Sequence, residues 1–479
     1  MKFPSLPSLR SGVETIKQTW IESITQKPDN QFKLILSTIL CLVTCWIGYV
    51  YADVPGVDGW QFWTWLCCFI FLMFLLYEKP GIRLHTNIWI LLGLFVAAML
   101  ARVIYLEAIP GLFHLDEAGV ASFARDSIFV NPNVQLNPFI TGPASMPTLH
   151  HYILRITMGI FGFTIFGLRI SSVVAGALGV VCTYLMVKTI AGKRIALFAA
   201  AMMVTYHFSV HWSRIGLNNI WDTLWIPLCI YAFCKGWKEK WYGGAIFSGF
   251  ALGISQYFYN GSKMVIFLLP IIVILLWKQE TDFKWKLGYL ARLGAVALCV
   301  AGPIFLFALR LPDVFFERTH QVFGWRDDAV LILLNGRLDY WEFFWRQLTL
   351  SLGTYTIYPD PTGFYNPGVP LLMGPAAILF LTGIVLAIYQ RSYIPLAWVL
   401  ITTFFGGFLL GVPNSCSHYV VVIPAICWLV AISLNWIWER GWQKVAMVLL
   451  AAIMAIDVYF YFVVFVSRLP GDFIYPFPT

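Results

Sequence analysis

Long apolar stretches, separated by short polar segments, recur along the chain from residue 33 onward. A helix needs roughly 20 predominantly apolar residues to cross the hydrocarbon core of a bilayer. Helix is favoured there because each backbone polar group is paired within its own segment. The pattern therefore predicts an all-α integral membrane protein with about 13 transmembrane helices. The predicted spans are residues 33–52, 60–77, 87–106, 169–190, 195–212, 218–236, 241–259, 264–277, 287–309, 368–388, 394–412, 418–438 and 443–466.

The apolar stretch at residues 148–167 is interpreted differently. Its uninterrupted apolar core has about 10–14 residues, a length typical of re-entrant or interfacial helices. His150, His151 and Arg155 suit a helix that lies on the outer membrane surface. We therefore predict that the first long outside loop covers residues 107–168.

A second long outside loop is predicted over residues 310–367, which are rich in charged and aromatic side chains. Within it, the stretch at 339–350 is typical of an amphipathic helix at the membrane interface. The chain shows no linker, no separate soluble domain and no clear internal repeat.

The basic residues indicate an orientation. Lys and Arg collect in the cytoplasmic loops of membrane proteins, and nearly all basic loops of this chain fall on one side if the N-terminus is cytoplasmic. Lys263 does not follow this pattern, because it lies in a short loop on the opposite side of the membrane. The first 30 residues are too polar for a signal peptide. The basic residues of the predicted cytoplasmic side are Lys2, Arg10, Lys17, Lys27, Lys79, Arg83, Lys193, Arg194, Lys235, Lys238, Lys240, Lys278, Lys284, Lys286, Arg440 and Lys444.

The composition supports a membrane location. Hydrophobic residues make up 59% of the chain and charged residues only 12%, against about 25% charged in a soluble domain. One core cannot bury so much apolar surface, so the rest must face lipid. The net charge of +8 follows from topology, because no basic run alternates with aromatics as a single-strand groove requires. We therefore expect the lipid bilayer, and no nucleic acid, as a partner.

The sequence GLFHLDEAGVASFARD, just after the span at 87–106, carries the adjacent carboxylates Asp116 and Glu117. Adjacent carboxylates at a membrane face repel each other and lose hydration, which raises one pKa toward values useful for a general base. The same pair would also suit a cap, with Asp116 before a helix over 117–127 and Glu117 in its first turn. The residues alone leave both interpretations open.

A second polar group bridges the spans at 195–212 and 218–236. It contains Arg214, Asn219 and Asp222, the last about one turn inside a span. An ionisable residue inside a membrane is costly and therefore suggests a functional site. A polar cluster packed against a neighbouring helix would give the same pattern.

The remaining candidates lie in the other outside loops. Because Lys263 breaks the charge pattern, we expect an anionic group to hold it: a lipid phosphate, another headgroup, or the carboxylate of Asp116 or Glu117. Histidines far apart in the sequence are compatible with a divalent metal but do not indicate one, and no cofactor is expected. No Gly-rich phosphate loop is present, which argues against a nucleotide substrate. The other polar candidates are Arg318, His320, His418 and Tyr419.

These motifs resemble the GT-C glycosyltransferases related to protein mannosyltransferases and the lipid A aminoarabinose transferase. The likeness covers roughly residues 87–310, with a weaker continuation to about 440. Asp116-Glu117-Ala118 opens the first loop as it does in the family. The later matching motifs are Met146-Pro147-Thr148-Leu149-His150-His151-Tyr152, Phe166-Gly167 to Arg169, Ser213-Arg214, and Tyr419 with Pro424.

The resemblance implies a GT-C fold, a polyprenyl-phosphate-sugar donor and inversion at the anomeric carbon. It gives Asp116, beside Glu117, the role of the catalytic base that deprotonates the acceptor. Arg318 and His320 match the polar cluster where, in the family, cations meet the lipid phosphate. The other candidates for that phosphate are Arg214 and Lys263, and the further polar candidates are Asn219, Asp222, His418 and Tyr419.

The chain also departs from the family pattern. The family often has Lys before the second motif, where this chain has Ala144-Ser145-Met146-Pro147, and many members have a carboxylate where this chain has Asn219. We expect no counterpart of the large C-terminal soluble domain of the aminoarabinose enzyme. The predicted units are a cytoplasmic tail with two extra transmembrane helices (1–86), a catalytic core (87–310), the second outside loop (311–367) and C-terminal transmembrane helices (368–479).

The predicted function is transfer of a sugar to an acceptor hydroxyl of a protein, glycolipid or glycan. The reaction takes place on the outer face of the cell membrane. A multi-span transporter or lipid flippase is an alternative, but it would more often show inverted repeats and helices broken at the bilayer centre. A polysaccharide polymerase or ligase, which uses the same type of donor, is another.

Overall fold

The computed structural model describes residues 28–51, 59–78, 87–111, 113–127, 138–142, 145–278 and 280–468. The predicted cytoplasmic tail up to residue 27 therefore lies outside the described residues, as do Lys79, Arg83 and Ala144. The described chain is helical, and within it only two isolated β-bridges occur, Thr141 with Pro147 and Phe323 with Leu410.

Each predicted span coincides with a helix or a pair of helices. The corresponding elements are α2 (Pro28–Val50), α3 (Gly59–Leu76), α4 (Ile88–Val103), α7 (Ile165–Ala191), α8 (Lys193–Thr205) with α9 (His207–Ser213), α10 (Asp222–Lys238), α11 (Tyr242–Ser255), α12 (Val265–Trp277), α13 (Phe283–Arg310), α17 (Gly374–Tyr389), α18 (Tyr393–Thr403), α19 (Ile423–Glu439) and α20 (Gln443–Tyr459). Short helical segments adjoin several of them: η3 (Asn219–Trp221), η4 (Asn260–Met264), η5 (Phe404–Phe408), η6 (Cys416–Val422), η7 (Phe460–Phe465) and α21 (Val466–Arg468).

Six of the described helical segments are long and apolar enough to cross a membrane, or seven if the bent pair α8 and α9 forms one span. Shorter apolar helices include α4, α11 and α17. The all-helical, membrane-embedded architecture is confirmed. The number of about 13 crossings stays a prediction, because several helices are shorter than a bilayer requires by themselves.

The predicted span at 195–212 is broken rather than continuous. Helices α8 and α9 meet at an angle of 59°. Arg102 of α4 is fully buried. Its guanidinium donates to the carbonyls of Met203 (3.1 Å) and Val204 (3.0 Å) at the end of α8. The same guanidinium donates to the hydroxyls of Ser209 and Ser213 in α9, each at 3.0 Å. Arg102 thus satisfies backbone groups that the break leaves without a helical partner.

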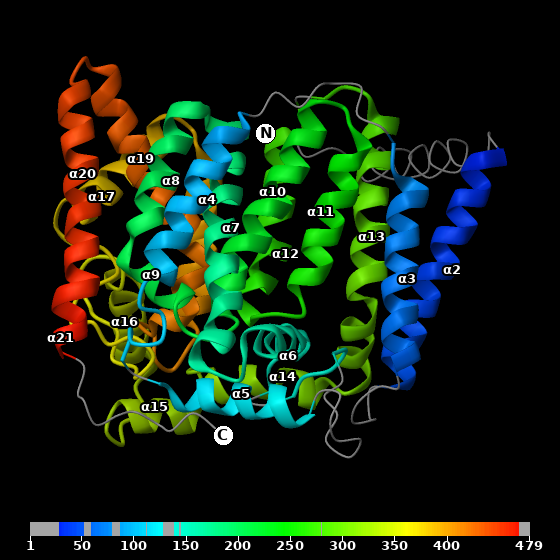
Figure 1. Ribbon diagram of the computed structural model, residues 1–479, viewed down its shortest axis with the longest axis horizontal. Coiled ribbons are helices and arrows are strands. Elements are labelled where there is room, and N and C mark those ends of the chain that lie inside the picture. The colour runs from blue at the N-terminus through cyan, green and yellow to red at the C-terminus, as the bar shows by residue number, and fades with distance from the viewer. Residues whose placement is uncertain are drawn as a thin grey trace.

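The centre of the molecule is formed by α7 and α19. In their most apolar windows, 78% and 89% of the residues are buried, against 28% for α2 and 33% for the segment containing α20. Figure 1 shows α7 in the middle of the bundle, with α2 and α3 at one edge and α20 at the other. Close packing depends on small residues: a Cβ on Gly179 of α7 would lie 2.6 Å from the Thr223 hydroxyl of α10.

The loop helices gather at one end of the bundle. Helices α5 (Leu115–Ser127) and α6 (Leu149–Phe161) come from the first predicted outside loop. Helices α14 (Pro312–Val322), α15 (Asp327–Leu333) and α16 (Tyr340–Gly353) come from the second. In Figure 1, α5, α6, α14 and α15 lie at the lower ends of the long helices. The helix predicted at 339–350 is α16, whose first turn Asp339 caps by accepting from the amides of Trp341 and Glu342, both at 2.9 Å.

The basic loops meet at the opposite end. Arg194 pairs with Glu439 at 3.8 Å, Lys240 with Glu280 at 2.9 Å, and Arg292 with Glu78 at 3.0 Å. These contacts join five loops that the sequence analysis assigned to one side of the membrane. The assignment of the N-terminus to the cytoplasm stays a prediction.

Candidate active site

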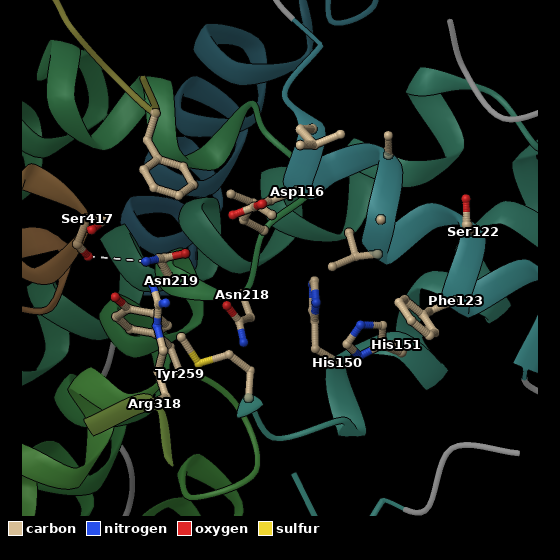
Figure 2. Close-up of a pocket in the computed structure, with 17 residues that line it drawn as sticks. Asp116, Ser122, Phe123, His150, His151, Asn218, Asn219, Tyr259, Arg318 and Ser417 are labelled. Carbon is tan, nitrogen blue, oxygen red and sulfur yellow. Dashed lines mark hydrogen bonds between the residues drawn. The ribbon is translucent and has the colours of Figure 1, made fainter. Parts of the chain in front are cut away.

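A cavity of about 490 Å³, which we call the main cavity, opens at the end of the bundle that carries α5 and α6. Figure 2 shows the side chains that line it. They come from seven segments distant in sequence: α5, α6 with the residues before it, the turn that leads into η3, the turn before η4, α14, the loop between α16 and α17, and η6. The lining residues used below are Asp116, Met146, His150, His151, Asn218, Asn219, Tyr259, Arg318, Phe364 and Ser417.

Asp116 stands in the first turn of α5 with its side chain on the main cavity. Its backbone N–H donates to Nδ1 of His114 at 3.0 Å, and the His114 ring stacks on Phe364 with centroids 4.5 Å apart. This contact fixes the start of α5 beside the loop that carries Phe364. In Figure 2 the Asp116 carboxylate lies across the cavity from Asn218 and Asn219. The carboxylate is exposed and is therefore available to a substrate hydroxyl.

Glu117 points the other way and does not line the main cavity. Its two oxygens accept from Nε and Nη2 of Arg169, both at 2.9 Å, and Oε1 also accepts from the Gly216 amide at 2.7 Å. Both side chains are fully buried. The sequence predicts a catalytic role for Glu117 beside Asp116, whereas this pairing makes Glu117 the residue that anchors α5 to α7. The difference follows from helix geometry, because successive side chains diverge by about 100°.

Arg214, which the sequence predicts beside the donor phosphate, is instead bonded to backbone carbonyl groups. Its buried guanidinium donates to backbone carbonyls of residues 101–109, at 2.8 Å to Arg102, 2.7 Å to Ile104 and 2.9 Å to Ile109. These carbonyls belong to the end of α4 and the following turn, and their helical partners are missing. Arg214 therefore closes the end of α4 and lines neither the main cavity nor the smaller cavity that adjoins it, unlike the phosphate-binding cation that the sequence predicted.

Arg318 connects the main cavity with a smaller one of about 180 Å³, which we call the side cavity. Lys263 lines the side cavity, and its amino group lies 4.1 Å from the Phe315 ring centroid. Arg318 donates to Gln321 at 3.4 Å, and its Nε has no hydrogen-bond partner among the described residues. His320 is exposed and lines neither cavity, so the structure does not bring it to the other cations. Residues two apart on a helix face nearly opposite ways.

Two further polar candidates line these cavities. Asn219 lines the main cavity and donates to the Ser417 carbonyl at 3.1 Å, the dashed line in Figure 2. His418 lines the side cavity, with its Nδ1 3.0 Å from the hydroxyl of Tyr259. Tyr259 lines both cavities and therefore belongs to the site, although the sequence analysis did not select it as a site residue.

The other two polar candidates line neither cavity. Asp222 is fully buried, and no described residue bonds its carboxylate oxygens. A Cβ on Gly261 would lie 2.3 Å from Asp222 Oδ2. The buried Tyr419 hydroxyl donates to the carbonyls of Pro413 (2.9 Å) and Ser351 (3.2 Å), so it ties η6 to α16. Both residues lie in the packing between elements, outside the two cavities.

His150 and His151 were predicted on an outer surface, but the structure buries both in the wall of the main cavity. Burial and the neighbouring ring of His151 lower the pKa of His150 well below its ordinary value. Burial likewise lowers the pKa of His151 to about 4. Nε2 of each ring has no hydrogen-bond partner among the described residues. Both are therefore neutral side chains at neutral pH, with a ring nitrogen left for another partner.

The loop between α16 and α17 carries a buried carboxylate that the sequence analysis missed. Asp360 is 4% exposed and accepts from the thiol of Cys416 at 2.6 Å and the hydroxyl of Thr362 at 2.8 Å. Burial raises the pKa of Asp360 to about 6. Because Phe364 and Ser417 line the main cavity, this contact holds two of its walls together. Among the described residues, no three potential metal ligands are grouped.

Comparison with known proteins bears out the family resemblance. A family model described as dolichyl-phosphate-mannose-protein mannosyltransferase matches residues 145–307. Two similar curated proteins are undecaprenyl phosphate-alpha-4-amino-4-deoxy-L-arabinose arabinosyl transferases, from Pseudomonas aeruginosa (24% identical over 263 residues) and Pseudomonas paraeruginosa (26% over 265). Each match covers 53% of this chain but only 42% of the relative. The matched part of the chain thus spans about two fifths of those relatives.

The fold is similar to a solved structure, ArnT from Cupriavidus metallidurans in the apo state. The TM-score is 0.50 at 17% sequence identity, over 76% of this chain and 63% of that one. At this identity the similarity concerns the fold. The resemblance to GT-C glycosyltransferases of the arabinosyl transferase and protein mannosyltransferase type is thereby confirmed.

Proposed function

We propose that this chain, which resembles the GT-C enzymes in sequence and fold, is a membrane glycosyltransferase. It transfers a sugar from a polyprenyl-phosphate donor to an acceptor hydroxyl, with inversion at the anomeric carbon. The acceptor is a protein, a glycolipid or a glycan. The relatives support the donor class, because their names specify undecaprenyl phosphate or dolichyl phosphate sugars.

The observation that carries this proposal is the placement of an exposed carboxylate and two cations around adjoining cavities. Asp116 lines the main cavity, Lys263 lines the side cavity, and Arg318 lines both. Glycosyl transfer from a phosphate needs a base for the acceptor and positive charge for the leaving group. Asp116 can supply the base, and Arg318 and Lys263 can supply the positive charge.

The reaction is a single displacement. The acceptor hydroxyl lies in the main cavity, and Asp116 takes its proton as the oxygen attacks C1 of the sugar. A new C1–O bond forms while the bond from C1 to the phosphate oxygen breaks, and the electron pair leaves with the phosphate. Arg318 and Lys263 stabilise the negative charge that grows on that phosphate. Attack opposite the leaving group inverts C1.

Uncharged polar groups orient the sugar. The side chains of His150, Asn218 and Asn219 line the main cavity and suit hydrogen bonds with hydroxyl groups. Holding donor and acceptor in line lowers the entropic part of the barrier, which supplies much of the rate enhancement in such reactions.

The side cavity suits the start of a polyprenyl tail. Phe267, Phe316 and Phe405 line it, and the rings of Phe267 and Phe405 stack at 4.7 Å. Phe267 is half exposed on the outside of the bundle, where lipid would meet it. A donor phosphate beside Lys263 and Arg318 can therefore keep its apolar tail against the membrane.

The proposed face of the membrane is the outer one. The basic loops meet at the end of the bundle opposite the two cavities, and basic loops favour the cytoplasm. Nucleotide sugars are scarce outside the cell, so a lipid-linked donor suits this location.

Asp116→Asn tests the proposal. The purified full chain is given a polyprenyl phosphate sugar labelled in the sugar, with an acceptor fraction from membranes, and released polyprenyl phosphate is measured. Asn keeps the size of the side chain but cannot take the proton, so we expect the rate to fall by about 10²–10⁴.

The matched control is Asp126→Asn. Asp126 lies on the same helix, is exposed and pairs with Arg125 at 2.6 Å, away from the main cavity. It should leave transfer unchanged. If Asp116→Asn transferred sugar at the wild-type rate, the assignment of Asp116 as the base would be wrong.

A further inference from the structure

A third cavity, of about 390 Å³, lies at the end of the bundle that carries the basic loops. We call it the hairpin cavity, because it lies between one end of the helical hairpin formed by α2 and α3 and the neighbouring ends of α11 and α13, although α2 also packs directly against α13. Its lining comes from the beginning of α2, the end of α3, Tyr242 at the start of α11 and the first turns of α13. Figure 1 shows α2, α3 and α13 side by side at one edge of the molecule.

Three cations line the hairpin cavity: Lys33 from α2, with Lys284 and Arg292 from α13. Arg292 is held in place, since it pairs with Glu78 at 3.0 Å and stacks 3.7 Å from the Tyr242 ring centroid. Within the part of the chain that the structure describes, no carboxylate pairs with Lys33 or Lys284.

The acidic side chain that lines the hairpin cavity, Asp282, already accepts a backbone hydrogen bond. Asp282 accepts from the Trp285 amide at 3.0 Å and so caps α13. It does not form an ion pair with either lysine. The positive charge of Lys33 and Lys284 is therefore left for a group from outside the described chain.

The remaining lining is mostly apolar and includes one serine, Ser37. Leu34, Leu76, Leu287 and Ala295 line the hairpin cavity, and Leu34 is 43% exposed on the outer side of α2. A Cβ on Gly288 would lie 3.1 Å from the Tyr242 hydroxyl and 3.2 Å from an Arg292 nitrogen. The glycine therefore leaves space for these two side chains beside α13. Cations, aromatic rings and an apolar wall at a helix end are typical of headgroup depth.

We propose that the hairpin cavity binds the headgroup phosphate of an anionic phospholipid, with Lys33 and Lys284 as the binding cations. The acyl chains lie along the outer faces of α2 and α13. A lipid in this position bridges the N-terminal hairpin to the core, since Lys33 belongs to one and Lys284 to the other. Basic pockets between transmembrane helices bind anionic lipids in this way.

The test compares lipids on the purified full chain in a neutral detergent. Phosphatidylglycerol or phosphatidylcholine is added, and the midpoint of thermal unfolding is followed with the native tryptophans. We expect phosphatidylglycerol to raise the midpoint by several degrees and phosphatidylcholine to leave it nearly unchanged.

Two double variants test whether the stabilisation by phosphatidylglycerol arises at the hairpin cavity. In Lys33→Gln/Lys284→Gln the half-effective phosphatidylglycerol concentration should rise by at least about tenfold, because each basic residue near an anionic surface contributes roughly a factor of five. Lys193→Gln/Lys444→Gln removes the same charge from exposed positions outside the cavity and should leave the concentration unchanged.

Three results would overturn the proposal. The first is an equal effect of phosphatidylcholine, and the second is an equal loss in the control pair, which would indicate general surface charge. The third is the same stabilisation by inorganic phosphate alone, because the apolar wall would then contribute nothing. Since the measurement does not involve sugar transfer, it stands independently of the proposed function.

Discussion

At the scale of single residues, the pair Asp116 and Glu117 shows how two neighbouring carboxylates take different roles. Asp116 faces the main cavity, and Glu117 is buried against Arg169. The environment, not the residue type, separates them. The Glu117 carboxylate accepts three close hydrogen bonds inside the bundle and does not line the main cavity, where an acceptor would lie.

Glu117→Gln should destabilise the protein strongly, because it leaves the Arg169 charge buried without its counter-ion. Breaking a buried ion pair by removal of one partner costs about 3–5 kcal/mol. We expect a lower midpoint of thermal unfolding in detergent. The double variant Glu117→Gln/Arg169→Met removes both charges and should recover part of the loss. A single variant as stable as the wild type would contradict the anchoring role.

His150 provides a prediction on binding. If Nε2 bonds a substrate hydroxyl, His150→Leu should raise KM for the donor or acceptor by about tenfold, in line with the loss of one buried hydrogen bond of about 1–2 kcal/mol. His150→Gln keeps a polar group in the cavity and should lie in between. His320→Leu is the control, because His320 is exposed and lines neither cavity. Equal KM values in His150→Leu and wild type would remove His150 from the site.

At the scale of elements, the site depends on helix ends and loops that buried polar side chains hold together. Arg102 and Arg214 bond carbonyls at the break between α8 and α9 and at the end of α4. Arg102 lies inside a predicted span, where a charge is costly, and the sequence makes Arg214 a candidate for the donor phosphate. Their cost is offset by backbone carbonyls that would otherwise lack partners.

The loop between α16 and α17 should make stability depend on pH through Asp360. Its pKa is about 6 in the folded protein, against about 3.9 in an unfolded chain. The folded state thus binds this proton more tightly, so the contribution of Asp360 is most favourable below about pH 4. It decreases as the pH rises to about 6, by about 3 kcal/mol in total.

Asp360→Asn isolates this effect, because Asn stays neutral and can still accept from the Cys416 thiol. Unfolding free energies of both proteins are measured from pH 4 to pH 8. The variant should gain about 3 kcal/mol relative to wild type across this range. A difference between the two proteins that does not change with pH would show that Asp360 titrates normally.

At the scale of the whole molecule, the alternation of loops between two ends explains how distant segments form one site. Residues 116, 150, 219, 318 and 417 line one cavity although three hundred positions separate the first from the last. Each belongs to a segment that the charge pattern assigns to the same side. The ion pairs Arg194–Glu439, Lys240–Glu280 and Arg292–Glu78 join the loops at the other end.

Much of this arrangement could be predicted from the sequence. The apolar stretches place the helices, since only a helix satisfies its own backbone in lipid, and α6 and α16 form where the pattern indicates surface helices. The first loop motif identified Asp116 as the carboxylate of the cavity. The separation of Arg318 from His320 was also accessible in principle, because helical periodicity places them on different faces.

The sequence by itself determined the helical membrane architecture, the grouping of loops and the position of the candidate base. These follow from local hydrophobicity and charge, which each segment carries wherever it packs. Only the tertiary structure decided that Glu117 and Arg214 are buried in backbone and ion-pair contacts, and that His150, His151 and Tyr259 belong to the cavity wall. The physical reason is that a polar side chain takes its role from the partners that folding brings within hydrogen-bond distance, and those partners lie far away in the sequence.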